Sequence, residues 1–527
     1  MKSAASAATR AVCLILVCAM GCQAPTTEAD LLAGVQTHIE QLVAEGEVPS
    51  IAIAVARDGK ILWEQGFGLA DRQRRLPATE HTPYPLASIS KPLTATGLMV
   101  LAEQGLIDLE APIDDYLGQT KLRSYAGDSA QATVRRVASH TAGLPLHDQH
   151  FYDGETKHPP CVDKTIERYG ILVTAPGERY QYSNLGYGLL GHALSQVSGQ
   201  GYAQVMQAKV FRPLGMDQAS VYAGSGLEKG QAVKYMSSGA VVPPCETDSP
   251  GASAIYASAQ DLIRFAMLHL QTPLPDQQII LGDATLDAMQ QPSPETGPLR
   301  PWEQAGSGYG IGWFIGVTED GLRVVQHSGG TLGVSAVLAL VPEQRLAVVV
   351  LSNTDSPWPD VIAIETLCAL LSYPPEAFLL PADKTAREIE RVLPPEWAGT
   401  WQGNVHTCEG KVPLALEVSA DGTVYATMGD QQRTPLRQVS YRDSQPQFMN
   451  AGGGPFLRGC LVGDLNTEDA SRGSPYKLWL ELKLREGQLT GVLIAFSQRT
   501  LYTGPLSHWV TLDRRPPAPL ALRPHSE

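Results

Sequence analysis

The sequence has none of the short motifs that identify several large enzyme classes. It contains no Walker A loop, no glycine-rich dinucleotide fingerprint and no His-Glu-x-x-His zinc motif. The Gly-x-Ser-x-Gly elbow is also missing, which argues against an α/β-hydrolase. Basic residues are the minority charge, because 40 Lys and Arg stand against 54 Asp and Glu in 527 residues, a formal net charge of −14. No basic cluster stands out, and the composition therefore favours no nucleic-acid partner.

Long apolar runs are scarce, and the most prominent one stands at the beginning of the chain. Residues 1–22 carry Lys2 and Arg10, then the apolar run 11–20, then Gly21-Cys22. This is the pattern of a secretory signal, and its core is too short to span a bilayer as a permanent helix. A small residue followed by cysteine favours lipid attachment at Cys22 over plain secretion, although Ala19 stands where such signals usually carry leucine. We therefore expect an exported protein of the periplasm or cell envelope, with a lipid on Cys22 as its membrane anchor.

Cysteine is also sparse, and five cysteines follow the signal. An oxidising compartment permits disulfides, and an odd count leaves at least one thiol free. We predict a pair between Cys408 and Cys460, which both lie in the C-terminal region. Cys161 and Cys245, in loops, form a candidate second pair, whereas Cys368 lies in an apolar helix where a buried free thiol is ordinary.

The string Ser88-Ile89-Ser90-Lys91 stands at a predicted helix start. Residues 76–87 read as loop, and helical periodicity then runs to a glycine stop at Gly105, with Pro92 suited to the first turn. Ser88 is therefore expected at a helix N-terminus, where free N–H groups stabilise negative charge, with the Lys91 amine over the same face. A serine hydroxyl needs such a base or cation to act as a nucleophile. The spacing alone leaves a serine cap with a solvated lysine equally open, and the same spacing in Ser474-Pro475-Tyr476-Lys477 predicts only a surface turn before a strand.

The string Tyr182-Ser183-Asn184 lies between a turn and an apolar helix predicted over 185–197. A loop before a helix is a usual position for catalytic side chains. A tyrosine near a lysine cation can have its pKa lowered far enough to accept a proton from serine. Taken alone, such a triplet is more commonly a half-buried tyrosine with an asparagine cap.

The string His327-Ser328-Gly329-Gly330 precedes two predicted strands, 334–341 and 346–351. Consecutive glycines at a sheet edge indicate that backbone approaches something closely. The Gly330 N–H is therefore a candidate to join that of Ser88 as a pair of oxyanion donors. A glycine bulge in an edge strand is the alternative.

In this order the three strings resemble the SxxK, YxN and HxG motifs of the serine β-lactamase-like hydrolases, the group of class C β-lactamases, D-aminopeptidases and esterases. Secondary matches agree with this resemblance, which covers roughly residues 28–373: 139–144 (SHTAGL), 213–216 (PLGM), 259–262 (AQDL) and 309–313 (YGIGW).

The resemblance implies a role for each motif residue. Ser88 would be the acylated nucleophile, and Lys91 and Tyr182 would share proton transfer. Asn184 would hydrogen-bond the substrate or Lys91, and the third motif, His327 with Gly329 and Gly330, would line the substrate and oxyanion site. A histidine where a β-lactamase carries lysine is mostly neutral at pH 7, and it therefore favours an esterase or peptidase over an efficient β-lactamase.

A polar loop around 147–161 brings His147, Asp148, His150, Asp153 and His158 close together in the sequence. No established zinc spacing is present, and we interpret the segment as a lid or specificity loop without a metal. No cofactor is expected elsewhere.

The chain is too long for one ordinary domain. The hydrolase domain is expected over 28–373 and a linker with a short helix over 374–395, after a proline-rich change at Tyr373-Pro374-Pro375. Alternating apolar patterns and an Asp421-Gly422 turn then predict a small antiparallel β-barrel or sandwich over 396–514, followed by a proline-rich disordered tail, 515–527.

The sequence thus predicts an α/β (α+β) fold. An antiparallel sheet flanked by helices, with a helical subdomain, would precede the small β-barrel. The predicted function is a serine hydrolase acting through an acyl-enzyme on small esters, amides or peptides. The alternatives are a β-lactamase or penicillin-binding D,D-peptidase, and a non-catalytic relative that binds peptide or cell-wall fragments. The oligomeric state stays open.

Overall fold

A computed structural model describes residues 27–222, 230–299, 303–374, 393–441, 450–451, 456–501 and 503–515. The expected signal, the short linker helix and nearly all of the expected tail lie outside the described residues. None of the described helices combines the length and apolar character needed to cross a bilayer.

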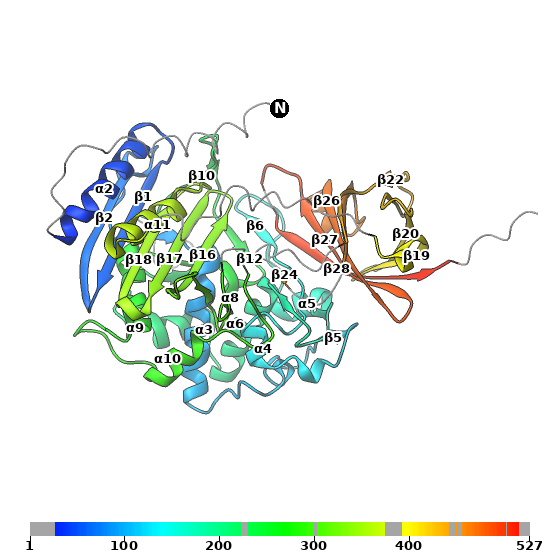
Figure 1. Ribbon diagram of the computed structural model, residues 1–527, viewed down its shortest axis with the longest axis horizontal. Coiled ribbons are helices and arrows are strands. Elements are labelled where there is room, and N and C mark those ends of the chain that lie inside the picture. Colours follow the sequence, from blue (N-terminus) through cyan, green and yellow to red (C-terminus); the bar gives the residue numbers. More distant parts are fainter. Residues whose placement is uncertain are drawn as a thin grey trace, which may run out of the picture.

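The larger, N-terminal part of the fold is built on one antiparallel eight-stranded sheet (Figure 1). In spatial order its strands are β14 (Gly308–Tyr309), β15 (Phe314–Val317), β16 (Arg323–Thr331), β17 (Val334–Val341), β18 (Leu346–Ser352), β1 (Ser50–Arg57), β2 (Lys60–Asp71) and β3 (Leu76–Pro77).

Helices cover both faces of this sheet because its strands are apolar on both sides. Along β1, Ile51, Ile53 and Val55 face α2 (Glu28–Ala44) and α11 (Trp358–Leu371), while the alternate alanines belong to the core on the opposite face. That opposite core also contains residues of α3 (Ser90–Glu103) and α9 (Ala259–His269).

The remaining helices form a subdomain beside the sheet (Figure 1). They are α4 (Val134–Ala138), α5 (Val162–Tyr169), α6 (Asn184–Ser198), α7 (Tyr202–Met206), α8 (Pro250–Ser253) and α10 (Asp283–Met289). Short strands connect the subdomain loops: β4 (Tyr84–Pro85) and β9 (Ser220–Val221) with β13 (Ile255–Ala257), β5 (Arg123–Ser124) with β7 (Ile171–Leu172), β6 (His150–Tyr152) with β12 (Cys245–Thr247), and β10 (Lys234–Tyr235) with β11 (Val241–Val242).

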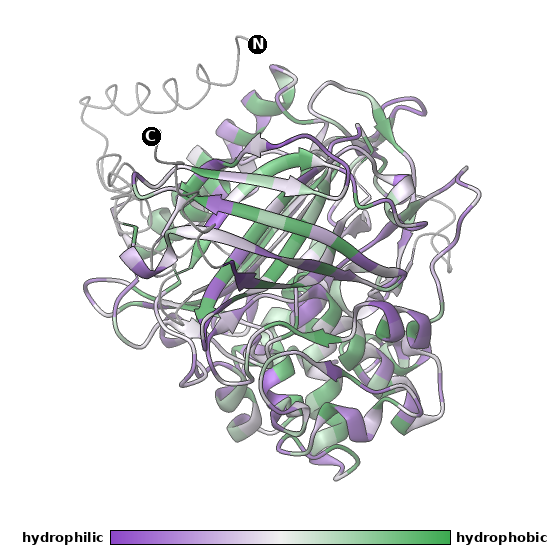
Figure 2. Cartoon of the chain, turned by 90° about the vertical axis from the view of Figure 1, so that its right-hand side faces the viewer, coloured by the Kyte–Doolittle hydropathy of each residue, from purple (hydrophilic) through white to green (hydrophobic). Residues whose placement is uncertain are grey.

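The C-terminal part, from Gly399 to Arg514, is a nearly closed antiparallel barrel of nine strands (Figure 1). In spatial order these are β22 (Thr434–Pro435), β21 (Val424–Met428), β20 (Gly410–Val418), β19 (Gly399–Thr407), β28 (Pro505–Arg514), β27 (Gln488–Ser497), β26 (Tyr476–Arg485), β25 (Leu457–Gly463) and β23 (Arg437–Ser440). The two end strands, β22 and β23, are separated in the chain by Leu436 alone, which brings the ends of the sheet together. Figure 2 shows apolar and polar residues mixed along the strands of the molecule, as expected where one face of a strand is buried.

These features confirm the predicted fold class. The predicted helix after Ser88 is α3, the one after Tyr182 is α6, and the strands predicted at 334–341 and 346–351 are β17 and β18. The other string with this spacing, Ser474-Pro475-Tyr476-Lys477, behaves as predicted. Ser474 precedes β26 and Lys477 lies on that strand, so no helix follows this serine.

The barrel is joined to the N-terminal part of the chain by backbone as well as side chains. Strand β24 (Asn450–Ala451) pairs with β8 (Tyr180–Gln181), immediately before Tyr182. The peptide groups of Asp148 and His150 donate to the carbonyls of Pro505 and Thr503, at distances of 3.2 and 3.0 Å. The barrel therefore supports the loops of the second motif and of the 147–161 segment directly.

Candidate active site

Ser88 lies in the 3-10 turn η1 (Ala87–Ile89), which leads into α3. The residue before it, Ala87, has a φ of +46°, a conformation that costs free energy in any residue except glycine. One turn on, Lys91 is fully buried, and its Nζ donates to Ser88 Oγ at 3.1 Å and to the Ala252 carbonyl at 3.2 Å. The solvated-lysine alternative is therefore wrong.

Burial changes the proton affinity of Lys91. Loss of hydration lowers the pKa of its ammonium to about 7, against an opposing effect of the Asp148 carboxylate. At neutral pH a large fraction of Lys91 is thus a free amine, which is able to accept a proton.

Tyr182 faces the same hydroxyl. Its phenol hydrogen-bonds to Ser88, and Lys91 Nζ lies 4.7 Å from the centre of its ring. Burial raises the pKa of Tyr182 above its ordinary value, and the Ser88 hydrogen bond opposes this shift only in part. The expectation that a neighbouring lysine lowers this pKa is therefore wrong, because desolvation dominates, and Tyr182 carries its proton at neutral pH.

His140 holds the Tyr182 loop from behind. The Ser183 N–H donates to His140 Nδ1 at 3.1 Å, the Gln181 N–H donates to the His140 carbonyl at 2.7 Å, and the ring centres of His140 and Tyr182 are 4.3 Å apart. Burial and the nearby charges of Lys91 and His327 keep the pKa of His140 well below its ordinary value, so the ring is a neutral acceptor. The sequence shows His140 only as part of a family signature, without its role.

Asn184 begins α6, and its Nδ2 lies 3.4 Å from Asp148 Oδ2. Asp148 also accepts from Thr247 Oγ1 at 2.6 Å and pairs with His150 Nε2 at 3.2 Å. Burial alone would lower the pKa of His150, but the Asp148 carboxylate raises it to about 9, so this histidine is a cation. Two members of the histidine- and aspartate-rich loop thus form a buried ion pair beside Asn184.

The third motif lies on β16, against the turn that carries Ser88. A Cβ added at Gly329 would stand 2.0 Å from the Leu86 carbonyl oxygen, whereas one at Gly330 would meet nothing within 4 Å. Glycine at position 329 therefore lets β16 approach η1. Strand β15 pairs with β16 only as far as Gln326, so from His327 onward β17 is its one partner among the described strands.

His327 is buried, and both ring nitrogens face protein atoms. Nδ1 donates to the Ser328 carbonyl at 2.7 Å, because a carbonyl oxygen only accepts, and Nε2 lies 3.1 Å from the Tyr309 hydroxyl. The structure thus brings Ser88, Lys91, Tyr182, Asn184, His327 and the two glycines into one region.

The predicted disulfides are not formed, because all five described cysteines are free. Cys408 lies in the turn between β19 and β20, while Cys460 lies on β25, four places away in the strand order. Cys161 is exposed ahead of α5, and Cys245 lies on β12 with its sulfur 3.4 Å from Lys234 Nζ. In neither predicted disulfide pair do the two cysteines bond to each other, and sequence spacing alone could not show this.

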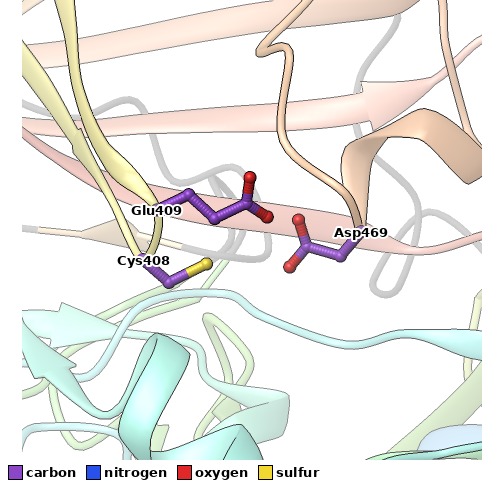
Figure 3. Close-up of side chains that lie close together, drawn as sticks. All are labelled: Cys408, Glu409 and Asp469. Atoms are coloured by element: carbon purple, nitrogen blue, oxygen red, sulfur yellow. The ribbon is translucent and has the colours of Figure 1, made fainter.

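One group of potential metal ligands occurs in the described part of the chain, away from Ser88: Cys408, Glu409 and Asp469, with ligand atoms within 4.8 Å of one another (Figure 3). Burial raises the pKa of the Cys408 thiol, which disfavours the thiolate that a metal requires. Asp469 already accepts from Tyr169 and Thr467, and Glu409 accepts from the Glu468 N–H. We assign no metal to this group.

A family model described as Beta-lactamase matches residues 35–370, and the chain belongs to this family of serine hydrolases. Penicillin-binding protein 4* of Bacillus subtilis (strain 168) is 26% identical over 392 residues, which cover 69% of this chain and 82% of that protein. The octameric penicillin-binding protein homologue from Pyrococcus abyssi superposes with a TM-score of 0.56 at 24% identity, covering 91% of this chain and 100% of its own. The crystal structure of SurE with D-Leu gives a TM-score of 0.57 at 23% identity, with coverages of 86% and 98%. The last two likenesses concern the fold.

Proposed function

We propose that the protein is a serine hydrolase that forms an acyl-enzyme on Ser88. The observation that carries this proposal is the 3.1 Å contact between Lys91 Nζ and Ser88 Oγ, with the Tyr182 phenol on the same hydroxyl. A nucleophile and a base within hydrogen-bond reach are what acyl transfer requires.

The groups support a definite order of proton transfers. Lys91, as the free amine, takes the Ser88 proton while Oγ attacks the substrate carbonyl carbon. The N–H groups of Ser88 and Gly330 would hold the resulting oxyanion, an interaction whose loss typically costs about a hundred- to a thousand-fold in rate. Tyr182 then donates its proton to the leaving group as the carbonyl–heteroatom bond breaks, and the Lys91 ammonium returns a proton to the phenolate. Water repeats the sequence on the acyl-enzyme and releases the acid.

Small esters and peptides, including those of D-amino acids, are the substrates that we propose. Both nitrogens of His327 are engaged by Tyr309 and Ser328 within the protein, so neither is placed to bind a penicillin carboxylate. The fold likeness to SurE, whose structure was solved with D-Leu, is in keeping with a D-amino-acid substrate. β-Lactamase or D,D-peptidase activity is the alternative, and the sequence similarity to the relative named Penicillin-binding protein 4* supports it.

The enzyme proposal is tested by incubating the full chain with a fluorophosphonate and locating the adduct by peptide mass spectrometry. Labelling at Ser88, absent in Ser88→Ala, is expected. Equal labelling of both proteins, or none of either, would leave the non-catalytic peptide-binding relative as the better description.

Substrate class is tested separately, with steady-state rates on a short-chain nitrophenyl ester, a D-alanine anilide and nitrocefin. We expect turnover of the ester or the anilide to exceed that of nitrocefin. A nitrocefin rate larger by orders of magnitude would overturn the argument from His327.

We also propose export and lipidation at Cys22, which rest on the pattern of residues 1–22. Expression in a bacterium fed a clickable fatty acid should label the wild-type protein and not Cys22→Ala. Label on neither protein would contradict a lipid anchor.

A further inference from the structure

A pocket adjoins the nucleophile on one side. It is lined by Ala87, which precedes Ser88, by Thr331, which follows Gly330, and by Ala254, close to the carbonyl that accepts from Lys91. The pocket therefore opens beside both proposed oxyanion donors, where part of a bound substrate must lie.

The direction of β16 indicates which part of the substrate that is. Its His327 end lies beside Tyr182, with ring centres 6.5 Å apart, and its Thr331 end borders the pocket. The strand advances about 13 Å over these four residues, with the oxyanion position in between. Tyr182 is the proposed proton donor to the leaving group, so the leaving group lies at the His327 end and the acyl group at the pocket end.

Lys234 stands in the wall of this acyl-side pocket. Its side chain comes from β10, is only 6% exposed, and its Nζ lies 3.4 Å from Cys245 Sγ and 5.7 Å from the centre of the Tyr152 ring. The turn after Thr331 packs directly on it, because a Cβ added at Gly333 would stand 2.9 Å from Lys234 Cβ. Lys234 is thus fixed to the same turn that ends the proposed oxyanion strand.

No carboxylate within the described ranges pairs with Lys234, although buried ammonium groups are ordinarily paired. The other cation of the pocket, His150, is balanced by Asp148 at 3.2 Å. The pocket's own carboxylate, Glu246, is exposed to water, which screens it. A buried lysine that no carboxylate of the described residues pairs with therefore lies in the wall of the space proposed for the acyl group.

We propose that Lys234 binds an anionic group at the far end of the acyl chain, so that preferred substrates are esters or amides of acyl groups bearing a terminal carboxylate. This inference rests on the proposed acylation of Ser88 and adds the substrate class. Lys234 acts as a specificity-determining residue, because a charge-assisted hydrogen bond in a desolvated pocket discriminates strongly against a neutral tail.

The test uses two series of fluorophosphonates, with tails of three to five methylenes that end either in a carboxylate or in the methyl amide of that acid. Labelling rates at Ser88 are measured on the full chain by intact mass. We expect the best carboxylate probe to react at least ten-fold faster than its amide partner. Lys234→Met should abolish this preference, Lys234→Arg should restore part of it, and the exposed-lysine control Lys411→Met should leave it unchanged.

Each other result counts against the proposal. Equal rates for the two tails in the wild-type protein, or a preference that survives Lys234→Met, would overturn the role of Lys234 while the acyl-enzyme stands. A third probe carries an amine tail and tests the opposite charge. If the wild-type protein prefers this probe and Glu246→Gln removes the preference, the pocket binds cationic acyl groups instead. Absence of labelling by any probe would overturn the proposed function and this inference with it.

Discussion

Lys91 and Ser88 differ in their access to water, and this difference sets their chemistry. The amine is fully buried and the hydroxyl is partly exposed, so desolvation acts mainly on the base. An ordinary lysine would be about 99.9% protonated at pH 7, whereas a pKa of about 7 leaves roughly half of Lys91 able to accept a proton. In the proposed mechanism, this buried amine takes the place of the histidine of other serine hydrolases.

The rate of Ser88 labelling should therefore rise with pH and level off above about 7. Below this value Lys91 is an ammonium and cannot take the serine proton; above it the free amine dominates. The measurement is the second-order rate constant for fluorophosphonate labelling from pH 5 to 9. In Lys91→Met the rise should disappear and the rate should fall by about a hundred-fold or more. A profile with the same midpoint in Lys91→Met would assign the titration to another group.

His140 is predicted to act as a positioning residue for Tyr182. His140→Leu removes the acceptor of the Ser183 N–H, which costs about 1–3 kcal/mol, and releases the Tyr182 loop. We expect about ten-fold slower labelling of Ser88 with an unchanged pH midpoint. His140→Asn should recover most of the rate, because asparagine supplies an acceptor and tolerates the φ of +60° at this position. Equal rates for both variants would reject the role of this hydrogen bond.

Some of these residue-scale properties were predictable and others were not. The Ser88–Lys91 geometry follows from a helix whose first turn is marked in the sequence by Pro92 and whose end is marked by Gly105. The protonation of Tyr182 does not, because its burial depends on Phe314 and His327, which come from strands far along the chain. Lys234 belongs to none of the sequence motifs. Its position in the wall of the acyl-side pocket follows only from the structure, in which Gly333 packs against it.

At the scale of elements, the contact between β16 and η1 determines whether the site exists. The strand must lie against the Leu86 carbonyl for its proposed oxyanion donor to stand beside Ser88, and glycine at 329 permits this approach. The sequence predicted a close approach of the glycines, although it could not say which of the two needed the space.

Gly329→Ala is therefore expected to destabilise the fold, while Gly330→Ala is its matched control. The added methyl of the first overlaps the Leu86 oxygen, and forced overpacking of this kind costs about 1–3 kcal/mol; the second meets open space. Thermal unfolding should show a lower midpoint for Gly329→Ala and a near-native midpoint for Gly330→Ala. Equal midpoints would mean that β16 does not lie this close to η1.

Prediction of the elements succeeded where the periodicity was regular. Helices α3 and α6 and strands β17 and β18 correspond to predicted segments, and β26 is the strand predicted after the Ser474-Pro475-Tyr476-Lys477 string. Strands β25 and β28 were missed, because Gly459 and Cys460 interrupt the first pattern and Ser507 and His508 are polar residues that are buried in the second. The polar side chains of Ser507 and His508 face the part of the molecule outside the barrel. The alternation pattern of one strand does not show which other segment its residues contact.

At the scale of the whole molecule, the barrel and the N-terminal part of the chain share a buried charge cluster. The Arg179 guanidinium donates to Glu481 on β26, and Arg458 Nε lies 2.9 Å from the same carboxylate. Arg179 is fully buried, and its neighbours Tyr180 and Gln181 form the strand that pairs with the barrel. Stability and the position of Tyr182 are thus connected through one segment.

Glu481→Gln should accordingly lower the free energy of unfolding by about 3–5 kcal/mol, because it removes the one carboxylate that both Arg179 and Arg458 contact in this buried cluster. The control Glu417→Gln breaks an exposed pair with Arg433, which is worth at most about 1 kcal/mol. Chemical denaturation of the two variants provides the comparison. Similar small losses would indicate that the two halves are held by their backbone pairing and apolar contacts instead.

The pairing of β24 with β8 has a practical consequence for anyone producing pieces of this protein. A gene fragment that stops at residue 370, where the family match ends, still encodes all three motif strings. Its product would leave β8 without its partner β24 beside Tyr182, and an unpaired strand invites self-association. It would also leave Arg179 without Glu481. Crystallisation or inhibitor screening is therefore better begun with the whole polypeptide than with its apparent catalytic half.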